Sequence, residues 1–206
     1  MKTESILEFL KFKYHHSEPY SEYELAEISN LTIKRFDMNR DVLPVKFDDL
    51  RNFKALTTLT INSCVIDKKV VADICHVKTL STLILINCSL ANNAKKELRK
   101  STIRNLVIDN GEVDVECAEG IFLDSLKVSG QIIKNNIKLN ANTIDLSKCD
   151  AVNKYIFYNE YIEKLIISEW QYSQDMEFFH NLNKYVKIME NNGQFLYKEL
   201  IADGGI

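Results

Sequence analysis

Apolar residues recur along this chain at offsets of 0, 3 and 5, with polar residues between them. The pattern is clearest in two stretches, residues 56–64 and 80–88, which both read Leu-x-x-Leu-x-(Ile/Leu)-x-x-Cys. Alternation of the second and third apolar positions, as at Leu59 and Ile61, has the period of a short strand with one buried face. Each stretch therefore predicts a β-strand that ends in a turn.

The same spacing can be followed over most of the chain. Its second position is occupied in turn by Leu31, Leu59, Leu83, Leu106, Leu126, Ile144, Leu165 and Val186. Successive members lie 18 to 28 residues apart, which indicates an internal repeat whose units bury their apolar residues only by stacking on one another. The pattern therefore predicts about eight parallel strands side by side.

The ninth position of each repeat falls in the turn after the predicted strand, where a small, buried side chain is needed. Cysteine occupies it three times, at Cys64, Cys88 and Cys149. Other residues fill it elsewhere, namely Phe36, Gly111, Gln131 and Trp170. We expect the row of turn side chains to be interrupted at those four places.

The complete motif, Leu-x-x-Leu-x-Leu-x-x-Cys-x-Leu in residues 56–66 and 80–90, resembles the leucine-rich repeat. The resemblance implies an α/β fold, a solenoid with a curved parallel β-sheet on its concave side and short helices or extended turns on its convex side. It also implies that the concave sheet face is the binding surface.

A single domain covering residues 1–206 is predicted, because no stretch has the composition of a flexible linker. Residues 1–28 would form a helical N-terminal cap, residues 28–193 the repeats, and residues 194–206 a C-terminal cap and tail. Apolar spacing predicts a helix over residues 3–14, and Ser21 with Glu24 has the pattern of a capping box that starts a second helix. This cap resembles that of bacterial leucine-rich repeat proteins of the internalin type.

The segments that connect the strands differ in length, so different structures are expected. Helices are predicted over residues 67–77, with Asp67 as N-cap, and over residues 93–99 and 172–182. The repeats of 20 and 18 residues leave little room for a helix, and extended or 3₁₀ segments are expected there. Residues 195–202 are expected to form the closing element of the chain.

Composition narrows the class of protein. A net charge of −3 at pH 7 gives no general attraction to nucleic acid, and no apolar run is long enough for a membrane span. Five cysteines, an odd number, and no secretory signal pattern predict free thiols in a reducing, cytoplasmic setting. Cys64 and Cys88 would lie in adjacent turns, where distance alone does not forbid a disulfide. A protein partner is therefore expected, rather than nucleic acid or a membrane.

Catalytic interpretations find little support. His15 and His16 have no further ligand at metal-binding spacing, so neither a metal nor another cofactor is expected. Cys75 and His76 could suggest a nucleophile and its base, but adjacent residues of a helix do not face each other. An enzyme with a site on the convex side or in the caps, for example at Cys75 and His76, is the alternative to a non-catalytic protein.

The strand positions that alternate with the buried ones are mostly small and polar, with one exception. Three apolar residues stand together in neighbouring repeats, with three charged residues beside them: Ile84, Ile86 and Val107, then Asp109, Lys127 and Asp145. Either β-branched residues are simply common in strands, or these six residues form an apolar anchor with a charged rim that binds a protein partner. The sequence thus favours a non-catalytic protein-binding module, such as a bacterial immunity, effector or adaptor protein, and self-association would use the same surface.

Overall fold

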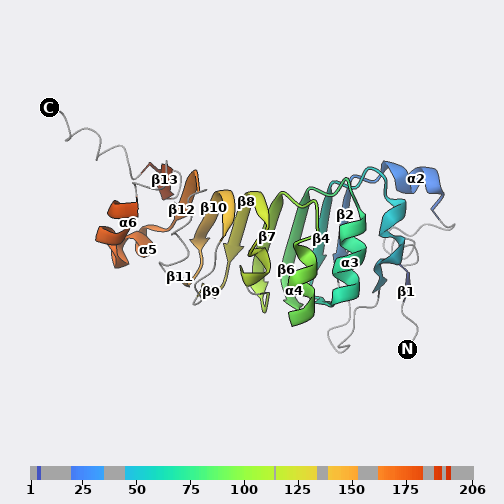
Figure 1. Ribbon diagram of the computed structural model, residues 1–206, viewed down its shortest axis with the longest axis horizontal. Helices are drawn as coiled ribbons and strands as arrows, with labels where there is room; N and C mark the ends of the chain where they lie inside the picture. The colour runs from blue at the N-terminus through green and yellow to red at the C-terminus, as the bar shows by residue number, and fades with distance from the viewer. Residues whose placement is uncertain are drawn as a thin grey trace.

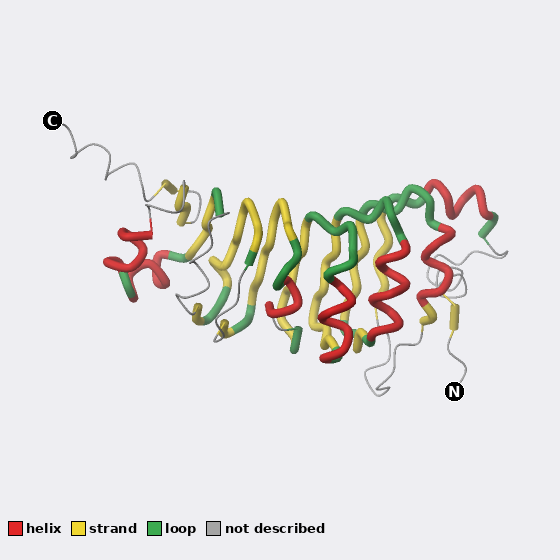
Figure 2. The backbone as a smooth tube through the Cα atoms, viewed as in Figure 1, coloured by secondary structure: helices red, strands yellow, loops and turns green. Residues whose placement is uncertain are grey.

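The computed structural model describes residues 4–5, 20–34, 45–113, 115–133, 139–152, 162–182, 188–191 and 194–195. Within these residues the protein is an α/β structure, with an open and mainly parallel sheet and a few short helices (Figure 1). Figure 2 shows the strands as a single extended row, with the helices α3 (Lys68–His76) and α4 (Asn92–Leu98) side by side on one face of it. We call this the covered face and the opposite one the open face.

The order of the strands in the sheet follows the order of the chain. Each strand is hydrogen-bonded to the one before it and parallel to it, in the series β2 (Asn30–Lys34), β4 (Thr58–Asn62), β6 (Thr82–Leu90), β7 (Asn105–Gly111), β8 (Phe122–Ser129), β10 (Asn140–Lys148), β12 (Lys164–Ile167) and β13 (Ile188–Asn191). The antiparallel β14 (Gln194–Phe195) closes the series, and β5 (Val65–Ile66) pairs with the end of β6. Two short parallel pairs lie outside it, β1 (Glu4–Ser5) with β3 (Val45–Lys46) and β9 (Ile132–Ile133) with β11 (Ala151–Val152).

The pairing register confirms the predicted second positions for seven of the eight strands. Neighbouring strands bring together, in order, Leu31, Leu59, Leu83, Leu106, Leu126, Ile144 and Leu165. The eighth prediction is wrong, because Met189 and not Val186 lies opposite Leu165, and Val186 itself is outside the described residues. Strand β13 runs directly into a hairpin with β14, and an Asn-Gly pair, a strong hairpin signal, stands between them in the sequence. The hairpin aligns β13 with β14, and the register of β13 against β12 departs from the repeat spacing.

The core lies between the sheet and the elements on its covered face. The second and third apolar positions of the strands are almost completely buried, as at Leu59 and Ile61, and belong to one continuous cluster. Helix α3 begins where Asp67 Oδ1 accepts a hydrogen bond from Val70 N at 2.9 Å, and it buries Val70, Val71 and Ile74. Both α3 and α4 thus confirm the helices predicted at these positions.

Three further elements connect the strands. The 3₁₀-helix η2 (Val115–Ala118) stands in the 20-residue repeat, as predicted. The 3₁₀-helix η1 (Phe47–Asn52) was not predicted; it buries Phe47 and Leu50 in the long first repeat. The predicted helix over residues 172–182 is wrong as a single element, because α5 (Glu169–Gln174) and α6 (Met176–Leu182) are separated at Asp175. Asp175 has a non-helical backbone, and its Oδ1 accepts a hydrogen bond from Phe178 N at the start of α6.

The two ends of the chain agree only in part with the predicted caps. Helix α2 (Glu22–Glu27) begins with the predicted capping box, in which Ser21 Oγ accepts from Glu24 N and the Glu24 carboxylate accepts from Ser21 N. The helix predicted over residues 3–14 is wrong at Glu4–Ser5, which form strand β1, and its other positions from residue 6 onward lie outside the described residues. The expected closing element over residues 195–202 contributes the end of β14, and the rest of it is likewise outside the described residues.

Cysteine side chains in the turns after the strands bond to the end of the preceding strand. Cys88 Sγ donates to Ile61 O at 3.3 Å, and Cys149 Sγ donates to Val128 O at 3.2 Å. Burial, together with nearby Asp145 and Asp150, raises the pKa of the Cys149 thiol to about 12, so this thiol keeps the proton that it donates. All five cysteines are free thiols, as expected.

Of the four predicted interruptions of this row of turn side chains, those at Gln131 and Trp170 are wrong. The one at Gly111 is confirmed, because glycine has no side chain, and Phe36 lies outside the described residues. Gln131 Nε2 donates to Val113 O, so Gln131 continues the row. Gly111 stands opposite Cys88 with a φ of +84°, and a Cβ there would lie 2.5 Å from Cys88 O, so only glycine fits. Trp170 is 56% exposed, and the neighbouring Gln171 fills the turn instead.

Candidate functional site

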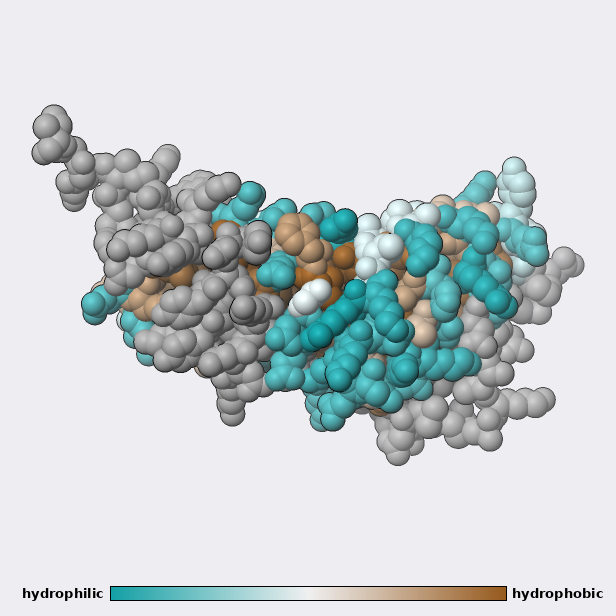
Figure 3. All heavy atoms as spheres, in the orientation of Figure 1, coloured by the Kyte–Doolittle hydropathy of each residue, from teal (hydrophilic) through white to brown (hydrophobic). Residues whose placement is uncertain are grey.

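The open face carries the strand side chains that alternate with the buried ones. From β4 to β10 most of these side chains are half-buried, because each lies beside the equivalent residue of the next strand. Many of them are small, polar and bonded across strands: Ser125 Oγ donates to Asn105 Oδ1 at 3.0 Å, and Asn105 Nδ2 donates to Thr82 Oγ1 at 3.4 Å. Figure 3 shows the other side of the molecule, where α3 and α4 present mainly hydrophilic residues.

The three predicted apolar residues form one continuous patch on the open face. Ile84 of β6 lies opposite Val107 of β7, and Ile86 lies opposite Asp109 in the next row. Strands are about 4.8 Å apart and alternate residues about 7 Å apart, so these four side chains occupy the corners of a small rectangle. We call Ile84, Ile86, Val107 and Asp109 the rectangle; three of its corners are apolar and the fourth is a carboxylate.

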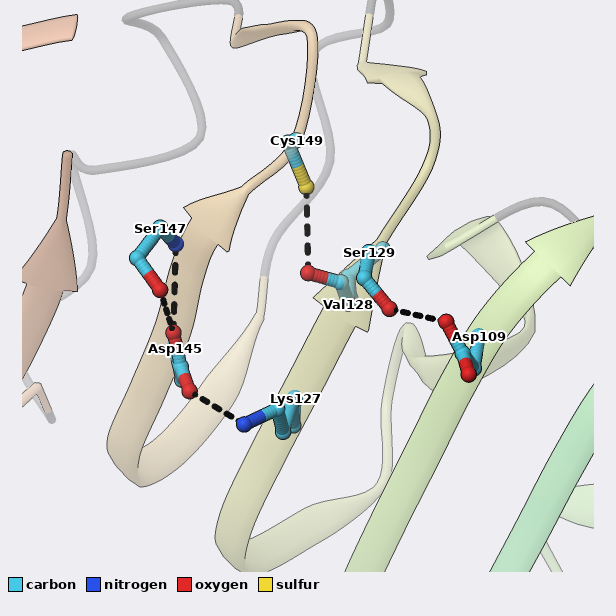
Figure 4. A network of polar contacts seen from close by, with 7 residues as sticks. All are labelled: Asp109, Lys127, Val128, Ser129, Asp145, Ser147 and Cys149. Atoms are coloured by element: carbon cyan, nitrogen blue, oxygen red, sulfur yellow. Dashed lines mark hydrogen bonds and ion pairs between the residues drawn. The ribbon is translucent and has the colours of Figure 1, made fainter. Parts of the chain in front are cut away.

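The two other predicted charged residues bind each other. Lys127 of β8 and Asp145 of β10 are opposite in the register, and Lys127 Nζ lies 3.0 Å from Asp145 Oδ2 (Figure 4). Asp145 Oδ1 also accepts hydrogen bonds from Ser147 N at 3.1 Å and from Ser147 Oγ at 2.7 Å. Burial opposes ionisation of Asp145, but the bonds from Ser147 and Lys127 outweigh it and hold the pKa of this carboxyl below its usual value.

Asp109 is oriented by neutral partners. Its Oδ1 accepts hydrogen bonds from Ser129 Oγ, on the next strand, and from Asn110 Nδ2 at 3.0 Å. Figure 4 shows Ser129 reaching toward Asp109 while Lys127 reaches the other way, toward Asp145. No cation among the described residues pairs with Asp109, so its negative charge is not neutralised.

All six residues predicted for the site therefore lie on the open face, on four consecutive strands from β6 to β10. The sequence interpretation missed the partners that orient the two carboxylates, Ser129 and Ser147, and it treated Lys127 and Asp145 as separate rim charges. Their pairing follows from the register, since both occupy the same row on neighbouring strands.

The alternative catalytic pair does not assemble. Cys75 Sγ lies 3.6 Å from Glu97 O, whereas His76 Nδ1 lies 2.7 Å from Ala72 O in its own helix. Burial, followed by the charge of Glu97, raises the pKa of the Cys75 thiol, which is the opposite of what activates a nucleophile. His15 and His16 are outside the described residues.

Two further findings concern metals and membranes. No group of three or more His, Cys, Asp or Glu side chains in the described part of the chain has the arrangement of a metal site. None of the described helices has the length and apolarity that crossing a membrane would need.

Comparisons with protein-family models, with curated proteins and with solved structures found no match to this chain.

Proposed function

We propose that this chain is a leucine-rich repeat solenoid that catalyses nothing and binds another protein through the open face of its sheet. The repeat interpretation is supported by the motif in residues 56–66 and 80–90, by strands that pair in chain order, and by turn cysteines that bond to the preceding strand. In such a repeat the open face is the concave side, and α3 and α4 stand on the convex side.

One observation carries the binding proposal, namely the apolar patch of Ile84, Ile86 and Val107. Elsewhere on these rows the described strands carry mainly polar or charged side chains, which water solvates well, and the aliphatic Ile166 stands apart from the patch beside Asp145. Three adjoining aliphatic side chains at the middle of a long sheet are the arrangement of an interface centre, where a few buried residues supply most of the binding energy. The polar residues around them would form the rim.

The experiment is a binding comparison between two variants that add the same charge on opposite faces. The chain is immobilised and used to capture a partner protein from a lysate of the cells in which the chain occurs. The captured protein is then purified and titrated against the parent, Ile84→Glu and Asn93→Glu. Ile84→Glu places a carboxylate in the patch. Asn93 is exposed in the first turn of α4, where an acidic residue suits the helix, so Asn93→Glu leaves the fold and the open face unchanged.

Ile84→Glu is expected to weaken binding by about 2 kcal/mol or more, while Asn93→Glu binds like the parent, and circular dichroism shows both folded. Equal binding by the parent and Ile84→Glu would reject the open face as the binding surface. If the captured protein is a second copy of this chain, sedimentation of the same variants gives the same comparison for self-association.

A further inference from the structure

The rectangle on the open face combines two kinds of surface within the reach of a single side chain. Ile84, Ile86 and Val107 offer aliphatic contact at three corners, and Asp109 offers a carboxylate at the fourth. The diagonal from Ile84 to Asp109 is about 8 Å, from the strand and residue spacings of a sheet. That distance is close to the length of an extended basic side chain.

Asp109 is free to accept a further cation. Its Oδ1 holds Ser129 Oγ and Asn110 Nδ2, which fix the carboxylate without neutralising it. The nearest basic residue in the register, Lys127, stands opposite Val107 and binds Asp145 at 3.0 Å. The second oxygen of Asp109 therefore has neither an ion-pair partner nor a hydrogen bond within the described residues.

We propose that the rectangle binds an arginine or lysine side chain from a short, apolar segment of the partner protein. This inference rests on the proposed function and makes it more specific. The aliphatic stem lies across Ile84, Ile86 and Val107, and the charged head pairs with Asp109. Long basic side chains bury their stems on apolar surface while the charge stays at a polar site. A charge-assisted hydrogen bond to a carboxylate that is already oriented is stronger than one between neutral groups.

The Lys127–Asp145 pair sets the direction of this side chain. Lys127 borders Val107, but its ammonium group points away from β7 and pairs with Asp145 (Figure 4). The row of Ile84 and Val107 therefore offers a basic head no unpaired carboxylate. Asp109, in the row of Ile86, does offer one, so the head lies in that row and the stem extends toward Ile84 and Val107.

The test is selection of short peptides from a random phage-displayed library on the purified full chain. Four baits are compared: the parent, Asp109→Asn, Ile84→Glu, and Asp150→Asn as the matched control. Asn at position 109 keeps an oxygen that can accept from Ser129, so the variant removes charge and little else. Asp150 is exposed in the turn after β10 and lies outside the open face, so the control makes the same substitution elsewhere.

The parent and Asp150→Asn are expected to enrich sequences that combine apolar residues with an arginine or lysine at a constant position. Asp109→Asn should retain the apolar residues and lose the basic preference. A synthetic peptide with the enriched sequence should bind Asp109→Asn about tenfold or more weakly than the parent, with a smaller dependence on salt. Replacing its basic residue with norleucine, which keeps the stem, should have the same effect on the parent.

The two proposals fail in different ways. The proposal of a basic side chain is rejected by any of three outcomes: the parent and Asp109→Asn enrich the same sequences, the parent enriches apolar sequences without a basic residue, or the parent enriches nothing. None of these outcomes decides whether the open face binds a protein, which the titration of the parent and Ile84→Glu with the captured partner tests separately. If Ile84→Glu enriches the same peptides with the same affinity as the parent, both proposals are rejected, because the peptides bind somewhere else.

Discussion

Gln171 stands after strand β12, where the sequence pattern pointed to Trp170, and its side chain bonds to the end of β10 and the turn that follows it. The Gln171 side chain is only 5% exposed, and its Nε2 donates to Leu146 O and to Cys149 O, both at 2.8 Å. Its Oε1 accepts from Ser168 N at 2.8 Å and completes the capping box of α5. We therefore predict that Gln171→Met, which keeps the length of the side chain and removes all three hydrogen bonds, lowers the free energy of unfolding.

The magnitude follows from what each partner loses. Leu146 O retains a hydrogen bond from Cys149 N at 2.9 Å, so its loss is small. Cys149 O loses the buried donor that Gln171 supplies, which costs about 1–3 kcal/mol. Loss of the bond to Ser168 N weakens the start of α5 by about 1 kcal/mol. Together these give about 2–4 kcal/mol, or a fall in melting temperature of roughly 5–15 °C for a chain of this size.

Urea denaturation followed by far-ultraviolet circular dichroism measures this loss, and Trp170→Ala is the comparison. Trp170 is the single tryptophan and is 56% exposed, so its truncation should cost no more than about 1 kcal/mol. If Trp170→Ala proved more destabilising than Gln171→Met, then Trp170 would be the residue that closes the turn, and the reasoning from the hydrogen bonds of Gln171 would be wrong.

Three other predictions concern the strands, the turns and the ion pair. Leu59→Ala should lower the free energy of unfolding by about 2–5 kcal/mol, because Leu59 is fully buried. Thr60→Ala on the open face should lower it by at most about 1 kcal/mol. Equal losses in chemical denaturation would contradict the strand register. Gly111→Ala should lower the free energy of unfolding more than Gly120→Ala does. Both glycines have positive φ, but a Cβ would lie 2.5 Å from Cys88 O at Gly111 and no closer than 3.5 Å to any neighbour at Gly120. Equal melting temperatures of the two variants would show that the close approach at Gly111 does not matter. The lowered pKa of Asp145 contributes stability above the ordinary carboxyl pKa of about 4, and this contribution is lost as pH falls through the folded-state pKa. The stability deficit of Asp145→Asn at pH 7 should therefore shrink on acidification, and a deficit independent of pH would exclude this role of the ion pair.

The strands could be predicted from the sequence because two constraints act at each position. An apolar residue at the second and third positions must face the core, and a shift by one residue would turn it to solvent. That is why the register holds from Leu31 to Leu165 although the repeats differ in length. The prediction fails at the last strand, where the apolar pattern is faintest and Met189, not Val186, lies opposite Leu165.

The turns were less predictable, because several residue types meet the same physical requirement. One requirement is a donor for a carbonyl at the end of the preceding strand or in the turn after it, which Cys88, Gln131 and Gln171 all supply. At Gly111 the backbone instead leaves no room for a side chain. A search for small residues finds the cysteines and misses the longer amides. Gln171 also stands one residue later than the repeat spacing predicts, since it serves α5 as well as the turn.

For the candidate site, the sequence predicts which residues share a face but not how their charged side chains pair. Alternation along the strands was enough to place six residues on one face. The shared row of Lys127 and Asp145 on neighbouring strands implies that these two side chains meet. It does not tell which of two nearby carboxylates Lys127 chooses, because Asp109 lies on the diagonal within reach of a long side chain. Side-chain geometry decides this: Asp145 is directly opposite and is oriented by Ser147, while Ser129 and Asn110 already orient Asp109. The choice leaves one negative charge beside three aliphatic side chains, and the proposed preference of the patch for a basic partner residue over an apolar one depends on that charge.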